Sequence, residues 1–186
     1  MTLADLPASR ILLLPGWLSS DAAHWQSHWE RQYGYRRVEQ DDWVWPRRGD
    51  WMARLDEVLL ETDACAALVA HSLGCQLIAA WAAHSRHTAR VKAALLVAPP
   101  DTERADMPPN LFSWRPMACS RLPFASQVVT SDDDPFCTPG RAAGMATAWG
   151  SALTTIGPRG HINTNSGLGD WPQGQALLRD LLARST

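Results

Sequence analysis

Apolar runs of strand length alternate with longer segments of helical periodicity along the chain. Continuous apolar runs bounded by turn residues are typical of strands that are buried on both faces of a parallel sheet. The expected strands are 10–14, 35–41, 66–70, 91–98, 125–130 and 152–156, and the expected helices are 22–32, 50–61, 73–84, 139–149 and 172–184. This alternation predicts an α/β fold with about six mostly parallel strands and helices on both faces of the sheet.

The ends of these elements carry further signals. Asp21 and Asp50 stand at the start of two helical segments and are expected to cap them. The strand at 35–41 is more polar than the others, which suits the edge of a sheet. From 101 to 123 the pattern breaks, since prolines stand at 108, 109, 116 and 123 and no period is sustained. We therefore expect an irregular connection over the surface there.

Length and composition favour one ordinary globular domain over residues 1–186. The chain has 186 residues, of which 46% are hydrophobic and 19% are charged. A formal net charge of −2 gives no reason to expect binding to nucleic acid or to an anionic membrane. The chain holds no run of eighteen apolar residues, so no membrane span is expected. The first ten residues lack the pattern of a secretory signal and are expected to lead into the first strand.

Two residue types are unusual enough to interpret. Cys65, Cys75, Cys119 and Cys137 show neither CxxC spacing nor histidines at zinc-finger intervals, which favours free thiols in the reducing cytoplasm. The ten tryptophans, seven of them before residue 82, either fill gaps in a small core or form an aromatic wall beside a pocket.

One serine lies where a buried strand is followed directly by a helix. In 70–74, Ala-His-Ser-Leu-Gly, a small residue stands two places from Ser72 on each side. A sharp strand-to-helix turn requires such small residues, and it exposes the serine hydroxyl as a nucleophile. The backbone amide of Leu73 would then lie at a helix N-terminus, where it can stabilise an oxyanion. Ala70 replaces the first glycine of the usual G-x-S-x-G pattern, and the structural alternative is a serine that caps a core helix.

A histidine and an acid follow at suitable places. His161 stands in a glycine-containing loop after the last expected strand, and 132–134 holds three aspartates directly after the strand at 125–130. The order serine, acid, histidine is the one expected of an α/β-hydrolase. Asp134 is the first choice for the acid that orients the imidazole and Asp133 is the second, whereas the alternatives are turn capping and a three-aspartate metal site. The other histidines, at 24, 28, 71, 84 and 87, are explicable by exposure or local packing, and His24 and His28 have a spacing that can bind metal.

The loop after the first strand offers a second oxyanion donor. In 15–18, Pro-Gly-Trp-Leu, Gly16 permits a close approach and the backbone amide of Trp17 is the candidate donor. The Trp17 side chain, together with the apolar segment 107–117, is a candidate for the wall of an acyl pocket. Neither a metal nor a cofactor is required by this set of residues.

The sequence resembles the small serine hydrolases grouped with retinoblastoma-binding protein 9 and the bacterial YdeN proteins. The matching segments are 14–17 with 24–26, 70–74, 122–124, 131–136 and 160–163. The resemblance implies a compact α/β-hydrolase fold with little or no lid, a triad of Ser72, Asp134 and His161, and no cofactor. It implies no particular substrate.

The sequence thus favours hydrolysis of a small ester, or of an amide or thioester, through an acyl-enzyme. Short acyl chains are expected because no long lid segment is present. The main alternative is a hydrolase-like scaffold that binds a protein partner with little or no turnover. A metal-dependent phosphatase built on the aspartates is a third hypothesis, which the lack of a phosphate-binding glycine loop disfavours.

Overall fold

At the centre of the molecule is a six-stranded sheet in which every neighbouring pair of strands is parallel. The computed structural model describes residues 6–185, so the start of the expected lead-in, residues 1–5, lies outside the described residues. The strand order is β2-β1-β3-β4-β5-β6. The strands are β1 (Ile11–Leu14), β2 (Arg36–Arg37), β3 (Ala66–His71), β4 (Val91–Val97), β5 (Ala125–Thr130) and β6 (Ala152–Thr155). The predicted α/β class is confirmed.

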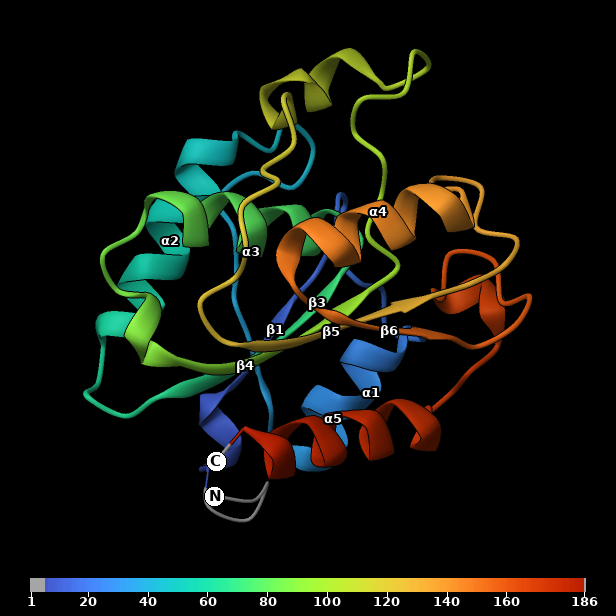
Figure 1. Cartoon of the computed structure of the whole chain (residues 1–186). Helices are drawn as coiled ribbons and strands as arrows, with labels where there is room; N and C mark the ends of the chain where they lie inside the picture. The colour runs from blue at the N-terminus through green and yellow to red at the C-terminus, as the bar shows by residue number, and fades with distance from the viewer. Residues whose placement is uncertain (1–5, 186) are drawn as a thin grey trace.

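Five helices cover the two faces of this sheet. They are α1 (Trp25–Tyr33), α2 (Arg48–Leu60), α3 (Leu73–His84), α4 (Pro139–Trp149) and α5 (Pro172–Arg184). Helices α2, α3 and α4 lie on one face, and α1 and α5 lie on the other (Figure 1). Successive side chains of a strand point to opposite faces, so Leu12 and Leu14 of β1 enter the first core while Ile11 and Leu13 enter the second. No helix within the described residues has the length and apolar character that crossing a membrane demands.

The second strand is shorter than predicted. It covers Arg36–Arg37 instead of 35–41, although its place at an edge of the sheet agrees with the prediction. One more backbone hydrogen bond, from the amide of Val38 to the carbonyl of Leu13, continues the contact with β1. The polar residues 39–42 that follow leave the sheet, because a run of acidic and amide side chains gains little from pairing along an edge.

Helix α1 begins three residues later than predicted, and the expected cap is wrong. The Oδ1 atom of Asp21 accepts a hydrogen bond from the amide of Ala23, which closes a local turn instead of a helix. The capping residue is His24, whose Nδ1 atom accepts from the amide of Gln26 at 3.1 Å. An imidazole nitrogen here accepts the capping hydrogen bond, which a side-chain oxygen usually accepts.

Asp50 does not cap its helix either. Helix α2 begins at Arg48, and the capping residue Arg47 makes no capping hydrogen bond through its side chain. Asp50 lies inside the first turn, where a negative charge still interacts favourably with the helix dipole.

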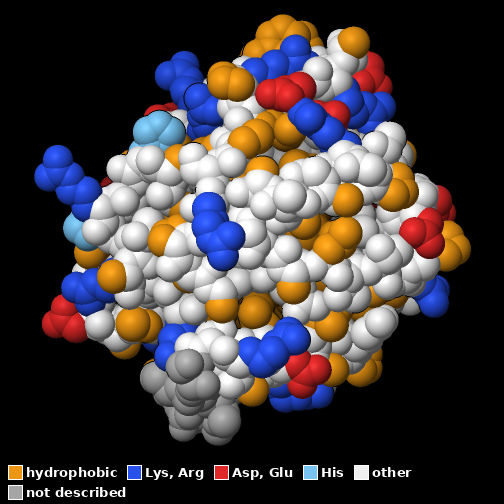
Figure 2. All heavy atoms as spheres, in the orientation of Figure 1, with side chains coloured by type: hydrophobic (Ala, Val, Ile, Leu, Met, Phe, Trp, Pro, Cys, Tyr) orange, Lys and Arg blue, Asp and Glu red, His pale blue; other side chains and the backbone are white. Residues whose placement is uncertain are grey.

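The 101–123 connection is irregular, as predicted, but it is more than a surface loop. It contains a 3₁₀-helix (Pro109–Trp114) and lies beyond α2 and α3, away from the sheet (Figure 1). Leu111 and Trp114 are buried, and the Trp114 indole donates to the carbonyl of Pro46 at 2.8 Å. Figure 2 shows exposed hydrophobic side chains at this end of the molecule, and Phe112 of the connection is half exposed.

Most of the tryptophans fill the two cores. Those with almost no exposed surface are Trp25, Trp29, Trp51, Trp81, Trp114, Trp149 and Trp171. Trp25, Trp29 and Trp171 form one contact cluster beneath the sheet, in which ring centroids lie 4.7 to 5.8 Å apart. Trp17 is only partly buried and lines a pocket. The core interpretation therefore holds for most of the tryptophans, and only Trp17 lines the pocket that contains Ser72.

Candidate active site

Ser72 alone forms the turn between β3 and α3, since β3 ends at His71 and α3 begins at Leu73. Its backbone has φ 53° and ψ −123°, a region that L-residues rarely adopt and that stores strain. The Ser72 side chain makes no capping hydrogen bond to the helix. Its Oγ atom instead lies 2.8 Å from Nε2 of His161, so this serine does not cap α3.

Two glycines permit the chain to close tightly around this turn. A Cβ atom on Gly16 would lie 2.7 Å from Cβ of Ser72, and one on Gly74 would lie 2.3 Å from the backbone oxygen of Leu14. Both distances are shorter than real contacts allow, so the loop after β1 approaches the turn only because these residues lack side chains. Ala70 is fully buried inside the sheet, which accommodates the methyl group that departs from the usual glycine.

His161 connects Ser72 to an acid. Its Nδ1 atom lies 2.9 Å from both carboxylate oxygens of Asp134. The two side chains are 8% and 1% exposed, so water competes little for this contact. Because a carboxylate only accepts hydrogen bonds, Nδ1 carries the proton and Nε2 is free to accept from the serine hydroxyl. The structure thus brings together the three residues that the sequence singled out.

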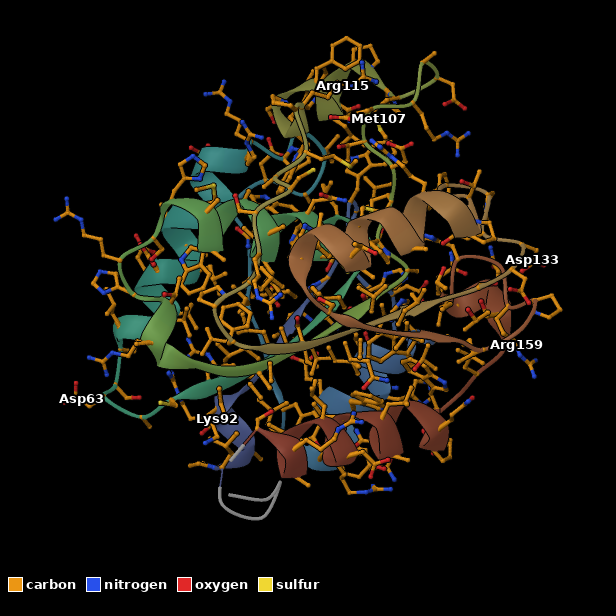
Figure 3. The ribbon with its side chains drawn as sticks, in the orientation of Figure 1. Asp63, Lys92, Met107, Arg115, Asp133 and Arg159 are labelled. Carbon is orange, nitrogen blue, oxygen red and sulfur yellow. The ribbon has the colours of Figure 1, made fainter. Side chains whose placement is uncertain are left out.

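Asp133, the second choice for the acid, holds the histidine loop instead. Its Oδ1 atom accepts from the amide of Gly160 at 2.7 Å and from the hydroxyl of Ser131 at 2.7 Å. Ser131 also accepts from the amide of Arg159 at 2.8 Å. Figure 3 shows Asp133 and Arg159 close together on the loops that follow β5 and β6. The loop after β5 therefore fixes the backbone that leads into His161.

Sequence reasoning missed two side chains that hold this loop from the other side. Nε2 of His71 lies 2.9 Å from the carbonyl oxygen of His161, so the imidazole donates this hydrogen bond. The Trp25 indole donates to the carbonyl of Ile162 at 2.9 Å. These partners are 90 and 137 residues apart in the chain, and no local pattern signals such contacts.

Ser72 and His161 open onto a pocket of about 410 Å³. Part of its wall is apolar and comes from Trp17, Met107, Leu111 and Phe136. Met107 belongs to the 101–123 connection, at the upper end of the molecule in Figure 3. Within residues 6–185, the backbone amides of Trp17 and Leu73 donate to no protein acceptor. Two donors beside Ser72 are therefore available to a bound molecule.

Two of the three histidines around the site are neutral at physiological pH. Burial lowers the pKa of His24 to about 4, and burial also lowers the pKa of His71 well below its usual range. Ring contacts join the three imidazoles, with centroids 4.7 Å apart for His24 and His71 and 5.0 Å apart for His71 and His161. The groups that pack against His161 thus add no positive charge near neutral pH.

The depressed pKa of His24 makes stability depend on pH. Above pH 6.5 this imidazole is neutral in the folded and the unfolded chain, so its contribution is constant. Between pH 6.5 and about 4, His24 is protonated in the unfolded chain but stays neutral in the folded chain. The free energy of unfolding therefore falls as pH falls. The loss should reach about 3 kcal/mol.

Urea unfolding at pH 4 and pH 7 measures this loss. We expect His24→Asn, which keeps a capping oxygen and cannot titrate, to lose about 3 kcal/mol less than the wild-type protein. Equal losses in both proteins would show that His24 does not couple folding to protons.

His24 and His28, whose spacing suggested a metal site, form hydrogen bonds within the protein instead. His24 caps α1 through Nδ1, while Nδ1 of His28 lies 2.8 Å from a carboxylate oxygen of Asp170. No group of three or more histidine, cysteine, aspartate or glutamate side chains suited to a metal ion occurs in the described part of the chain.

Comparisons with known proteins agree with this geometry at the level of the fold and at the level of the family. The fold is that of the α/β-hydrolases, which a carboxylesterase from Bacillus cereus shares at 15% identity and a TM-score of 0.62, over 97% of this chain and 91% of that one. A family model described as serine hydrolase matches residues 11–180. The chain therefore belongs to the serine hydrolase family and is an enzyme, a serine hydrolase.

Two further solved structures lie closer to this chain. A protein described as a YdeN-like hydrolase from Pectobacterium atrosepticum is 28% identical, with a TM-score of 0.82 over 94% of this chain and 91% of that one. The YdeN protein from Bacillus subtilis is 19% identical, with a TM-score of 0.74 over 93% of this chain and 98% of that one. A search of curated proteins found no significant match. The compact fold without an evident lid agrees with the sequence-based prediction.

Proposed function

We propose that this enzyme hydrolyses small esters through an acyl-enzyme formed on Ser72. The observation that carries the proposal is the continuous line of hydrogen bonds from Ser72 through His161 to Asp134. A hydroxyl, an imidazole and a buried carboxylate in this order make a nucleophile, its general base and the group that orients the base.

Each step follows from these positions. Ser72 Oγ attacks the ester carbonyl while His161 Nε2 takes its proton, and the backbone amides of Trp17 and Leu73 stabilise the oxyanion. The carbon–oxygen bond to the alcohol then breaks, and His161 returns the proton to the departing oxygen. A water molecule attacks the acyl-enzyme by the same route and releases the acid. Asp134 stabilises the imidazolium that forms in both halves of the cycle.

The apolar wall is the proposed site of the acyl group. Trp17, Met107, Leu111 and Phe136 offer it a surface that gains from burying methylene groups. A pocket of about 410 Å³ suits short acyl chains better than fatty ones. Amides and thioesters would follow the same steps with a different leaving atom.

The similarity to YdeN-like structures supports a closer grouping with the YdeN proteins. The grouping with retinoblastoma-binding protein 9 rests on the sequence motifs alone. The cytoplasm is the proposed location, because Cys65, Cys75, Cys119 and Cys137 are all unpaired.

A fluorophosphonate probe tests the proposal directly, because only an activated serine reacts with it. We expect the folded protein to form a single adduct, which peptide mass spectrometry locates on Ser72, and labelling to abolish hydrolysis of p-nitrophenyl butyrate. Heat-denatured protein is the control and should not react. A folded protein that neither labels nor hydrolyses the ester would favour a binding scaffold over an esterase.

A further inference from the structure

The lining of the pocket at Ser72 contains polar as well as apolar side chains. Besides the residues of the apolar wall, this lining includes Asp21 and His24, which come from the loop between β1 and α1. With residues 163–165, Asn-Thr-Asn, which begin two positions after His161 in the loop after β6, they make up what we call the polar side of the pocket. An ester placed on Ser72 would therefore have one apolar and one polar neighbourhood.

The position of the base decides which part of the ester meets the polar side. His161 Nε2 takes the serine proton and must then deliver it to the departing oxygen, so that oxygen lies within hydrogen-bond reach of this nitrogen. Residues 163–165 belong to the same loop, two to four positions further on. The leaving alcohol is therefore assigned to the part of the lining that includes these polar residues.

His24 supplies an unpaired hydrogen-bond donor on this side. Its side chain lines the pocket although the residue is only 3% exposed. Nδ1 accepts a hydrogen bond from the amide of Gln26, which leaves the proton of the neutral ring on Nε2. Nε2 is buried and has no partner among the described residues. Buried polar groups are nearly always paired, so an acceptor on a bound molecule would complete this one.

Asp21 supplies the matching acceptor. Its Oδ2 atom accepts from the hydroxyl of Thr164 at 2.7 Å, which joins the two loops into one polar wall. Asp21 is close enough to His24 to act on it electrostatically. Among the pocket-lining residues of the described chain it is the only acidic residue, and none is lysine or arginine. A carboxylate and a neutral imidazole N–H together suit a hydroxyl group, which both donates and accepts, and disfavour an anion.

We infer that the polar side is a leaving-group subsite, in which the Nε2–H group of His24 binds a hydroxyl of a small polyhydric alcohol that is esterified to a short apolar acid. This assignment rests on the proposed ester hydrolysis at Ser72 and adds the class of alcohol to it.

Two variants separate the donor from the helix cap. His24→Asn places a side-chain oxygen near the position of Nδ1 and keeps the cap, but it removes the donor at Nε2. His24→Gln places an amide N–H near the position of Nε2 and gives up the cap. The substrates are glycerol monobutyrate and n-pentyl butyrate, which form the same acyl-enzyme and differ only in the alcohol. Comparing each variant with the wild-type enzyme on each ester cancels the difference in intrinsic reactivity.

We expect His24→Asn to lower kcat/KM for glycerol monobutyrate about tenfold and to change that for n-pentyl butyrate by less than about twofold. His24→Gln should keep the glycerol ester within about threefold of the wild-type value, with a lower melting temperature from the lost cap. Equal losses on both esters, or no loss on either, would overturn the inference.

Hydrolysis of p-nitrophenyl butyrate, with Ser72→Ala as its control, separates the two levels of failure. If this hydrolysis depends on Ser72 but His24→Asn does not discriminate between the alcohols, only the leaving-group subsite is wrong. If no butyrate ester is hydrolysed in a Ser72-dependent way, the proposed function fails and the subsite fails with it.

Discussion

Replacement of Ser72 by alanine should lower kcat/KM for p-nitrophenyl butyrate by about 10⁴-fold to 10⁶-fold. The substitution removes the proposed nucleophile, a hydroxyl oxygen that lies 2.8 Å from Nε2 of His161. The oxyanion donors remain, because they belong to the backbone, so a small rate above that of water should persist. Steady-state hydrolysis at enzyme concentrations high enough to detect this residual rate makes the measurement.

Ser126 offers a matched control for this substitution. It lies near the start of β5, at the end of the strand away from the pocket, and its hydroxyl forms a hydrogen bond with that of Ser151. Ser126→Ala should therefore keep kcat/KM within about twofold. The Ser72→Ala protein should melt as the wild-type protein does, since its side chain supports no helix cap. A Ser72→Ala enzyme with more than about a tenth of the wild-type activity would remove this serine from the mechanism.

Replacement of Asp134 by asparagine is expected to lower kcat about 10³-fold to 10⁴-fold. Asparagine is nearly the same size, but its amide would present a donor to Nδ1 of His161, where both carboxylate oxygens now accept. The imidazole would then favour the tautomer with its proton on Nε2, which cannot take a proton from Ser72. Stopped-flow or steady-state kinetics, with melting temperatures for both proteins, make the test.

Asp133→Asn is the matched control and also discriminates between the two acids that the sequence offered. The Oδ1 atom of Asp133 accepts from Ser131 and from the amide of Gly160, and an asparagine oxygen accepts from both equally well. Activity should therefore stay within about threefold of the wild-type value. The opposite ranking, with the larger loss at Asp133, would mean that the acid had been assigned to the wrong residue.

The sequence predicted those parts of the fold that depend on local pattern. Continuous apolar runs such as 66–70 located the buried strands, because a strand covered on both faces needs nearly every side chain to be apolar. The ends of elements were less predictable. The carboxylate of Asp21 could cap a helix or close a local turn, and it closes the turn. The helix is capped instead by the imidazole of His24, which is not a usual capping group.

In the candidate site, too, the residues marked by a local pattern were predictable and the others were not. Ser72, Asp134 and His161 were predictable because each stands in the turn or loop that follows a strand, and the ends of parallel strands gather at one edge of the sheet. His71 and Trp25 were not, because each donates to a carbonyl group of the His161 loop. Every residue has a backbone carbonyl group, so the sequence carries no signal that marks the one to which a side chain will donate.

The proposed catalytic residues and the residues of the proposed acyl pocket come from different parts of the fold. Ser72, Asp134 and His161 follow β3, β5 and β6, whereas Met107 and Leu111 come from the 101–123 connection, which supplies no strand. This segment leaves the sheet after β4 and returns before β5, so insertions or exchanges within it need not disturb the register of any strand pair. If the apolar wall is the acyl site, as proposed, evolution or laboratory selection on this segment alone can alter which acids the enzyme accepts while its reaction stays the same.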